Sequence, residues 1–133
     1  MSILIENFWF RLHPVLERLA DKVVESNAGL TYAVGRSEND TFLLRAYLSF
    51  CTHGDGDEIA ITVDVKADHN LLTVISDICA DDGFIVATGP SLSVACQAYQ
   101  PGSSDELDAW FNEFEQFLRD TEVQILKMAS DLK

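Results

Sequence analysis

Apolar residues recur with the period of an α-helix at the start of the chain. Between residues 3 and 25 they fall at steps of three and four on one helical face: Phe8, Leu12, Val15, Leu19 and Val23. Asn27 and Gly29 then supply a helix stop. Pro14 lies inside this stretch, so either the helix bends there, or a short arm ends near His13 and a second helix starts with Pro14 in its first turn.

A second helical pattern covers residues 104–131 at the end of the chain. Ser103 and Glu106 occupy the paired positions of a capping box. One apolar face follows, made of Leu107, Phe111, Phe114, Leu118, Ile125, Ala129 and Leu132. At 1.5 Å per residue this predicts an amphipathic helix about 42 Å long.

Between these helices the apolar residues alternate with polar ones, which is typical of half-buried strands. Three segments show the alternation, at 30–34, 42–50 and 59–65. Because their connections are short, they predict an antiparallel meander. Two short strands, 84–88 and 92–99, are expected on either side of Gly89-Pro90.

The segment from Asp68 to Gly83 decides the topology. Its apolar residues fall at positions 71, 72, 74, 75, 78 and 79, which fits a helical period better than a strict alternation. Asp68 is a suitable N-cap and Gly83 a suitable end. We therefore predict a helix here. A strand would instead give a six-stranded meander.

These elements predict a single α+β domain, residues 1–133, in which helices pack on an antiparallel sheet in the order α-β-β-β-α-β-β-α, with a long C-terminal amphipathic helix. This order resembles the class I type III secretion chaperones and the related bacterial sensory-transduction-regulator-like proteins. The resemblance is carried by three segments: Asp68 to Gly83 as the middle helix, Phe84 to Tyr99 as the strand pair, and Ser103 to Leu132 as the closing helix. A strand at 68–83 would remove this topology.

The resemblance implies a homodimer formed through the middle helix and a neighbouring strand. It also implies an apolar groove on the first helix and the sheet that holds an unfolded stretch of a partner protein. In this chain the groove would use Trp9, Phe10 and outward sheet residues such as Tyr47.

Acidic residues are concentrated in the second half of the chain. Between Thr52 and Leu118 there are thirteen acids and one base, Lys66, and the net charge of the chain is −13. Such a field repels nucleic acid and anionic membranes and attracts basic partners. The absence of an N-terminal signal and of a long apolar run predicts a cytoplasmic protein.

No sequence motif indicates a cofactor, a metal centre or a catalytic site. The loop that carries His53, Asp55, Asp57 and Glu58 lacks the full spacing of a calcium loop, so a solvated hairpin is the simpler reading. The three cysteines, Cys51, Cys79 and Cys96, are expected to be structural thiols. Cys51 with His53 is the one pair that could support nucleophilic chemistry.

Three consecutive aromatic residues, Phe8, Trp9 and Phe10, cannot all lie on one helical stripe, because neighbours are about 100° apart. They are either wedged on two sides within the monomer or placed at an interface. The same question arises for Trp110 beside Phe111.

We therefore expect a non-enzymatic acidic protein-binding module, homodimeric, that holds a basic or partly unfolded partner. The residues expected to bind the partner are Phe8, Trp9, Phe10, Tyr47, Asp55, Asp57, Glu58 and Trp110. One alternative is an immunity protein or inhibitor that neutralises a basic toxin or nuclease through its acids. A second is a small ligand-binding or enzymatic domain that uses the Cys51 and His53 loop.

Overall fold

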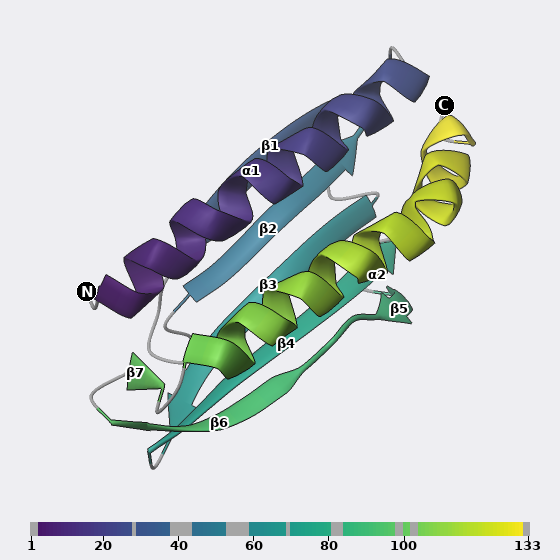
Figure 1. The fold of residues 1–133 in the computed structure, drawn as a ribbon. Coiled ribbons are helices and arrows are strands. Elements are labelled where there is room, and N and C mark those ends of the chain that lie inside the picture. The colour runs from purple at the N-terminus through teal and green to yellow at the C-terminus, as the bar shows by residue number, and fades with distance from the viewer. Residues whose placement is uncertain are drawn as a thin grey trace.

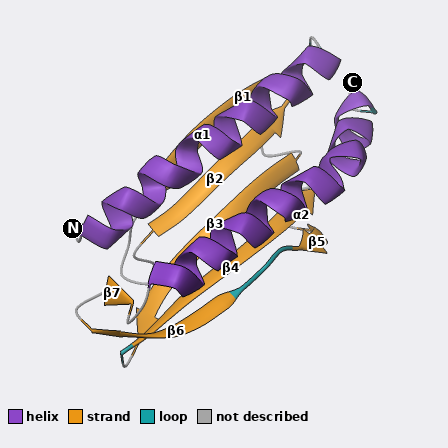
Figure 2. Ribbon diagram, viewed as in Figure 1, coloured by secondary structure: helices purple, strands orange, loops and turns teal. Residues whose placement is uncertain are grey.

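The computed structural model is a two-layer α+β structure, in which two helices lie on one face of an antiparallel sheet (Figures 1 and 2). The structure describes residues 3–27, 29–37, 44–52, 59–68, 70–80, 84–97, 100–101 and 104–131. The elements in chain order are α1 (Ile3–Ser26), β1 (Thr31–Ser37), β2 (Leu44–Cys51), β3 (Ile59–Asp68), β4 (Leu71–Ala80), β5 (Phe84–Thr88), β6 (Leu92–Gln97), β7 (Gln100–Pro101) and α2 (Ser104–Ser130). The predicted α+β class, the antiparallel sheet and the long C-terminal helix are confirmed.

The first four strands form a regular antiparallel meander in the order β1-β2-β3-β4. Strands β5 and β6 both pair with β4: β6 with its first half, from Leu71 to Val74, and β5 with its second half, from Asp77 to Ala80. The chain leaves the sheet between β5 and β6, at Gly89-Pro90. Strand β7 pairs with β6.

The predicted helix at 68–83 is wrong, because residues 71–80 form strand β4. Alternate residues of β4 are buried, but the sequence does not show a simple apolar–polar alternation, for two reasons. The buried row contains a polar residue, Ser76, and the opposite row contains apolar ones, Leu71 and Ile75. Because apolar residues occur in both rows and a polar residue occurs in the buried row, the apolar positions have an apparent helical period. The β-branched residues of this segment fit a pleated strand, and Asn70, with a φ of 68°, supports the tight connection from β3.

Of the two alternatives predicted at Pro14, the break near His13 is not present, because helix α1 is continuous through Pro14. Proline removes the hydrogen bond to the carbonyl of Phe10, four residues earlier. Both Pro14 and Phe10 are on the exposed side of the helix, where water can satisfy that carbonyl. The helix ends at Ser26, beside the predicted stop at Asn27.

The two helices run side by side in the same direction (Figure 1). Polar contacts join them at matched points along their length. Arg11 pairs with Asp108 in the N-terminal halves of the two helices, and Lys22 Nζ lies 2.9 Å from Glu122 Oε1 further along. Near the C-terminal ends, Asn27 Nδ2 donates to the carbonyl of Ala129 at 2.9 Å. These contacts fix the register of the helical layer.

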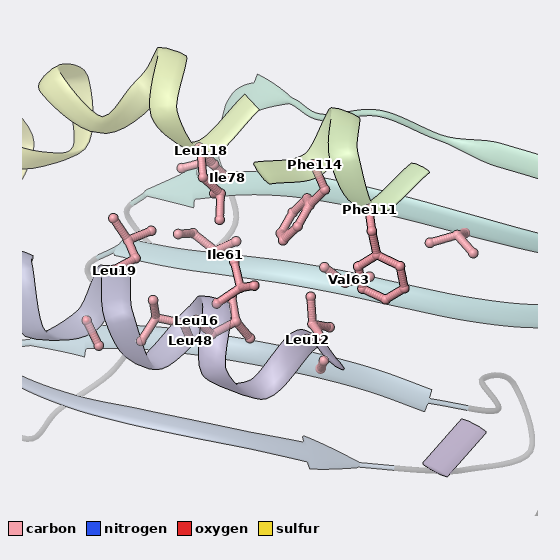
Figure 3. Packing of buried hydrophobic residues seen from close by; sticks show 14 of the residues in the cluster. Leu12, Leu16, Leu19, Leu48, Ile61, Val63, Ile78, Phe111, Phe114 and Leu118 are labelled. Atoms are coloured by element: carbon pink, nitrogen blue, oxygen red, sulfur yellow. The ribbon is translucent and has the colours of Figure 1, made fainter. Parts of the chain in front are cut away.

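The core lies between the helices and the sheet. Figure 3 shows how leucines of α1 and aromatic residues of α2 meet the inward side chains of β2, β3 and β4. Those labelled are Leu12, Leu16, Leu19, Leu48, Ile61, Val63, Ile78, Phe111, Phe114 and Leu118. The alternation predicted for β2 and β3 therefore reflects one face that is fully covered by helices.

The break between β5 and β6 is tied to this core by a small polar network. The carbonyl of Pro90 accepts hydrogen bonds from Ser76 Oγ at 2.9 Å and from Trp110 Nε1 at 3.0 Å. Gly89 N donates to the carbonyl of Ser76 at 2.9 Å. A Cβ at Gly89 would lie 2.4 Å from Ser76 Oγ and 2.8 Å from the Phe117 ring. The network satisfies the buried polar atoms of Ser76 and Trp110.

Candidate protein-binding surface

Two of the aromatic residues predicted to bind a partner, Phe8 and Trp110, are instead part of the core, with exposed fractions of 3% and 1%. The Phe8 ring packs between those of Trp110 and Phe111, at centroid distances of 5.6 Å and 4.9 Å. Trp110 also stacks on Phe114 at 5.0 Å. The prediction for Phe8 and Trp110 is corrected, because a buried ring has no surface to offer a partner.

Trp9 and Phe10 lie outside this core packing. Trp9 is half-buried, stacks on His13 at 5.0 Å and has the Arg36 guanidinium 5.6 Å from its ring centre. The Phe10 side chain is 72% exposed. Of the three consecutive aromatics, the first fills the core, the second packs along the β1 side of the helix, and the third faces solvent.

The sheet has a second face, which neither helix covers (Figure 2). It carries the outward positions of the three central strands. We call it the open face, and its residues are Arg45, Tyr47, Ser49, Ala60, Thr62, Asp64, Lys66, Leu71, Thr73, Ile75, Asp77 and Cys79.

Tyr47 belongs to the open face, as predicted for an outward sheet residue. It pairs with Gly35 of β1 and with Thr62 of β3. A Cβ at Gly35 would lie 2.6 Å from the Tyr47 hydroxyl oxygen. The ring therefore extends over the neighbouring strand toward the β1 edge, and glycine provides the space for it.

Exposed apolar side chains follow β4 along the open face. Leu71 is 44% exposed and Ile75 is 36% exposed. Ile85 of β5 pairs with Cys79 and is 55% exposed. These three residues form a row of apolar surface on one side of the open face.

Two carboxylates lie next to this row. Asp64, opposite Ile75, accepts hydrogen bonds from Arg45 Nε at 2.7 Å and Nη2 at 3.1 Å. Partial burial, and then the charge of Asp64, raise the pKa of Asp77 above its ordinary value. Within the residues that the structure describes, Asp77 has no ion pair with a base. A cation placed between Asp64 and Asp77 would be stabilised by both carboxylates.

The surroundings of the Cys79 thiol do not activate it. Burial raises the pKa of Cys79, and the charges of Asp77 and Asp64 raise it further, so its thiol stays protonated at neutral pH. Cys51 is half-buried, with its Sγ 3.3 Å from the Thr31 hydroxyl. His53 and the Cys96 side chain lie outside the described residues, so the Cys51 and His53 pair stays a prediction.

The acidic loop that carries Asp55, Asp57 and Glu58 also lies outside the described residues. Across the residues that are described, no group of three metal-ligating side chains comes together. Neither α1 nor α2 combines the length and the hydropathy needed to cross a membrane.

A shallow groove of about 320 Å³ runs between α1 and α2 on the outer side of the helical layer. Its floor is apolar, with Val15, Leu19 and Leu118. Its rim carries charges of both signs, among them the Lys22 and Glu122 pair. Because the floor residues also belong to the core, we treat the groove as the seam between two packed helices.

The sequence-based prediction missed Leu71, Ile75, Ile85, Asp64 and Asp77. A signal for Asp64 was present, since it alternates with buried Val63 and Val65. The signals for Leu71, Ile75 and Asp77 were lost when β4 was interpreted as a helix. Once residues 71–80 are known to be a strand, period-two alternation places these three side chains on one face.

No family model, curated protein or solved structure matches this chain.

Proposed function

We propose that this chain is a non-enzymatic protein-binding module that holds an apolar, basic segment of a partner protein on its open face. One observation carries the proposal: the sheet face opposite the two helices exposes an apolar row, Leu71, Ile75 and Ile85, beside Asp64 and Asp77. Apolar side chains of the partner would cover the row, and a lysine or arginine would reach the two carboxylates.

The apolar row, the two carboxylates and the net charge contribute to partner binding in different ways. Burial of the apolar row supplies affinity, at about 25 cal/mol per Å² of apolar surface removed from water. A base beside Asp77 removes the unfavourable proximity of two carboxylates, and so supplies specificity. The net charge of −13 increases the rate at which basic segments arrive.

This activity is of the kind that the secretion chaperones carry out, in which a folded domain holds an unfolded stretch of another protein. The proposal rests on the open face and the charge. It does not require the middle helix that the resemblance implied, which is strand β4 in this structure.

The direct test uses two unfolded proteins of opposite charge. Reduced, thiol-blocked lysozyme is basic and reduced, thiol-blocked α-lactalbumin is acidic. Binding of each to this chain is measured by fluorescence anisotropy at several salt concentrations. We expect saturable binding of the lysozyme chain, weakened by salt, and much weaker binding of the lactalbumin chain. Equal binding of both would contradict the charge preference.

Matched variants locate the binding surface. Ile75→Ser removes apolar area from the open face, and Val123→Ser makes the same kind of change at a 76% exposed position on α2. Loss of about 1 kcal/mol of apolar contact weakens binding about fivefold, so we expect this effect from Ile75→Ser and none from Val123→Ser. Equal effects from both variants would refute the assignment to the open face.

Charge reversal of Asp55, Asp57 and Glu58 separates this proposal from the inhibitor alternative. If the open face binds the segment, these changes mainly slow association. Abolition of binding by the charge reversals, with no effect from Ile75→Ser, would instead indicate an inhibitor that acts through its acidic loop.

A further inference from the structure

The two edges of the sheet are built differently. Strand β1 pairs with β2 at seven consecutive positions, from Thr31 to Ser37, without a bulge. The opposite edge is divided between β5 and β6 by Gly89-Pro90 and has an irregular register at Ile78 and Cys79 of β4. Monomeric proteins usually protect a long regular edge with a proline, a bulge or projecting charges. No proline or bulge protects β1.

Its one charged residue, Arg36, does not project from the edge either. Arg36 Nη2 lies 3.2 Å from Glu6 Oε1, and its guanidinium lies over the Trp9 ring. The side chain is thus held against α1. No strand within the described part of the chain pairs with the outer edge of β1, so its backbone presents a row of hydrogen-bonding groups.

Aromatic side chains lie on β1 itself and on α1, which packs beside it. Tyr32 is 38% exposed and donates from its hydroxyl to Glu17 Oε2 at 3.0 Å. Trp9 stacks on His13, and Phe10 follows on the solvent side. Exposed aromatic residues next to an unprotected strand edge are typical of a protein interface.

We propose that β1 pairs antiparallel with β1 of a second copy of this chain, about a two-fold axis at Val34. In the strand sequence Thr31-Tyr32-Ala33-Val34-Gly35-Arg36-Ser37, two of the three residue pairs equidistant from the centre are of the same chemical kind. In this register Val34 faces Val34, Ala33 faces Gly35, and the hydroxyl residues Thr31 and Ser37 face each other. Tyr32 faces Arg36, an aromatic ring opposite a long side chain of a different kind.

Within the strand itself, this register opposes no two like charges. On the open-face side the facing residues are Ala33 and Gly35, which are small. On the helical side, Tyr32 of one copy faces Arg36 of the other, which keeps its pairing with Glu6 of its own chain. This self-complementarity identifies a second copy, rather than an unrelated strand, as the occupant of the edge.

Salt distinguishes this contact from binding of a basic segment. Two copies, each with a net charge of −13, repel each other, and salt screens that repulsion. Strand pairing and aromatic contacts are insensitive to salt by comparison. Dimerisation should therefore strengthen as salt is added, whereas capture of a basic segment should weaken. The inference does not depend on the proposed function, because Ile75 and Val34 lie on opposite faces of the sheet.

The test combines sedimentation velocity with cysteine cross-linking. In a background with Cys51, Cys79 and Cys96 replaced by serine, Val34→Cys places two thiols on the axis. Residues directly opposite in an antiparallel pair have Cα atoms about 4.5–5.5 Å apart, which suits a disulfide. Ser37→Cys is the control, since two copies of that residue would be about 20 Å apart.

We expect a dimer whose population grows with salt, rapid disulfide formation by Val34→Cys, and none by Ser37→Cys alone. If Val34→Cys fails to fold, an equimolar mixture of Thr31→Cys and Ser37→Cys chains replaces it, and only the mixed disulfide should form. A monomer at every concentration and salt would overturn the inference. So would a dimer that does not cross-link through Val34→Cys or the mixture, or that cross-links equally through Ser37→Cys alone.

Discussion

The two faces of the sheet use the same strands for different purposes. On the face under the helices, Ile61 and Leu48 are completely buried and belong to the apolar core that the sheet shares with α1 and α2. On the open face, residues next to them in sequence, such as Thr62 and Tyr47, are half-buried at most. The comparison teaches that the strand backbone is common to both faces, while the covering layer decides what each side chain contributes.

On the covered face the side chains stabilise the fold. On the open face they contribute less to folding and remain available to a partner. If this division is correct, identical substitutions on the two faces should have unequal effects on stability and, for the open face, should act on binding.

The largest contrast is expected between Ile61→Ala and Ile75→Ala, which make the same change on neighbouring strands. Ile61 is fully buried and Ile75 is 36% exposed. We expect Ile61→Ala to lower the free energy of unfolding by about 2–5 kcal/mol, through lost burial and a cavity, and Ile75→Ala by about 1 kcal/mol or less. Urea denaturation measures both. Similar losses would mean that the open face is covered.

A smaller contrast is expected between two glycines. In Gly89→Ala the new methyl group meets Ser76 Oγ at 2.4 Å and the packed Phe117 ring at 2.8 Å, so strain of about 1–3 kcal/mol is expected. In Gly35→Ala it meets the end of the Tyr47 side chain at 2.6 Å. That ring can rotate away over the open face, so we expect a loss of about 0.5 kcal/mol. Thermal unfolding of the two variants compares them.

The smallest effect concerns Asp77 and depends on pH. A carboxyl whose pKa is higher in the folded protein binds its proton more tightly when folded. The contribution of Asp77 therefore lowers the stability as the pH rises from the ordinary aspartate pKa of about 3.9 through the raised value.

Asp77→Asn should consequently increase the free energy of unfolding at neutral pH and leave it unchanged below that range. Urea midpoints measured across the range test this. Asp64→Asn is the contrasting variant, because it removes the acceptor of two Arg45 hydrogen bonds and is expected to lower stability at neutral pH. A lower midpoint for Asp77→Asn at neutral pH would show that Asp77 has a cationic partner.

Much of the fold could be predicted from the sequence, where one face of an element is apolar and the other polar. This holds for α2, with its apolar stripe through Phe111 and Phe114, and for β3, where Ile61 and Val63 alternate with Thr62 and Asp64. In both elements the polar face is exposed or half-exposed, so the hydrophobic period is visible. For strand β4 the sequence predicts a helix instead, because apolar residues occur on both faces of the strand.

The candidate site was predicted less well for a related reason. An aromatic side chain adds the same hydrophobicity to a sequence whether it fills the core, as Trp110 does, or faces solvent, as Phe10 does. Of the predicted binding residues that the structure describes, Trp9, Phe10 and Tyr47 keep accessible surface, and Phe8 and Trp110 do not. The proximity of Asp64 and Asp77 follows only from the register between β3 and β4.

By itself the sequence determined the two terminal helices, the early strands, the α+β class and the strong negative charge, because these follow from local periodicity and composition. The tertiary structure decided which face of the sheet stays uncovered, which aromatic residues are buried, and that residues 71–80 extend as a strand. These outcomes depend on contacts between residues far apart in the chain, such as the pairing of β4 with β3, β5 and β6. Such contacts can override a local period, because a strand gains its hydrogen bonds only from its neighbours.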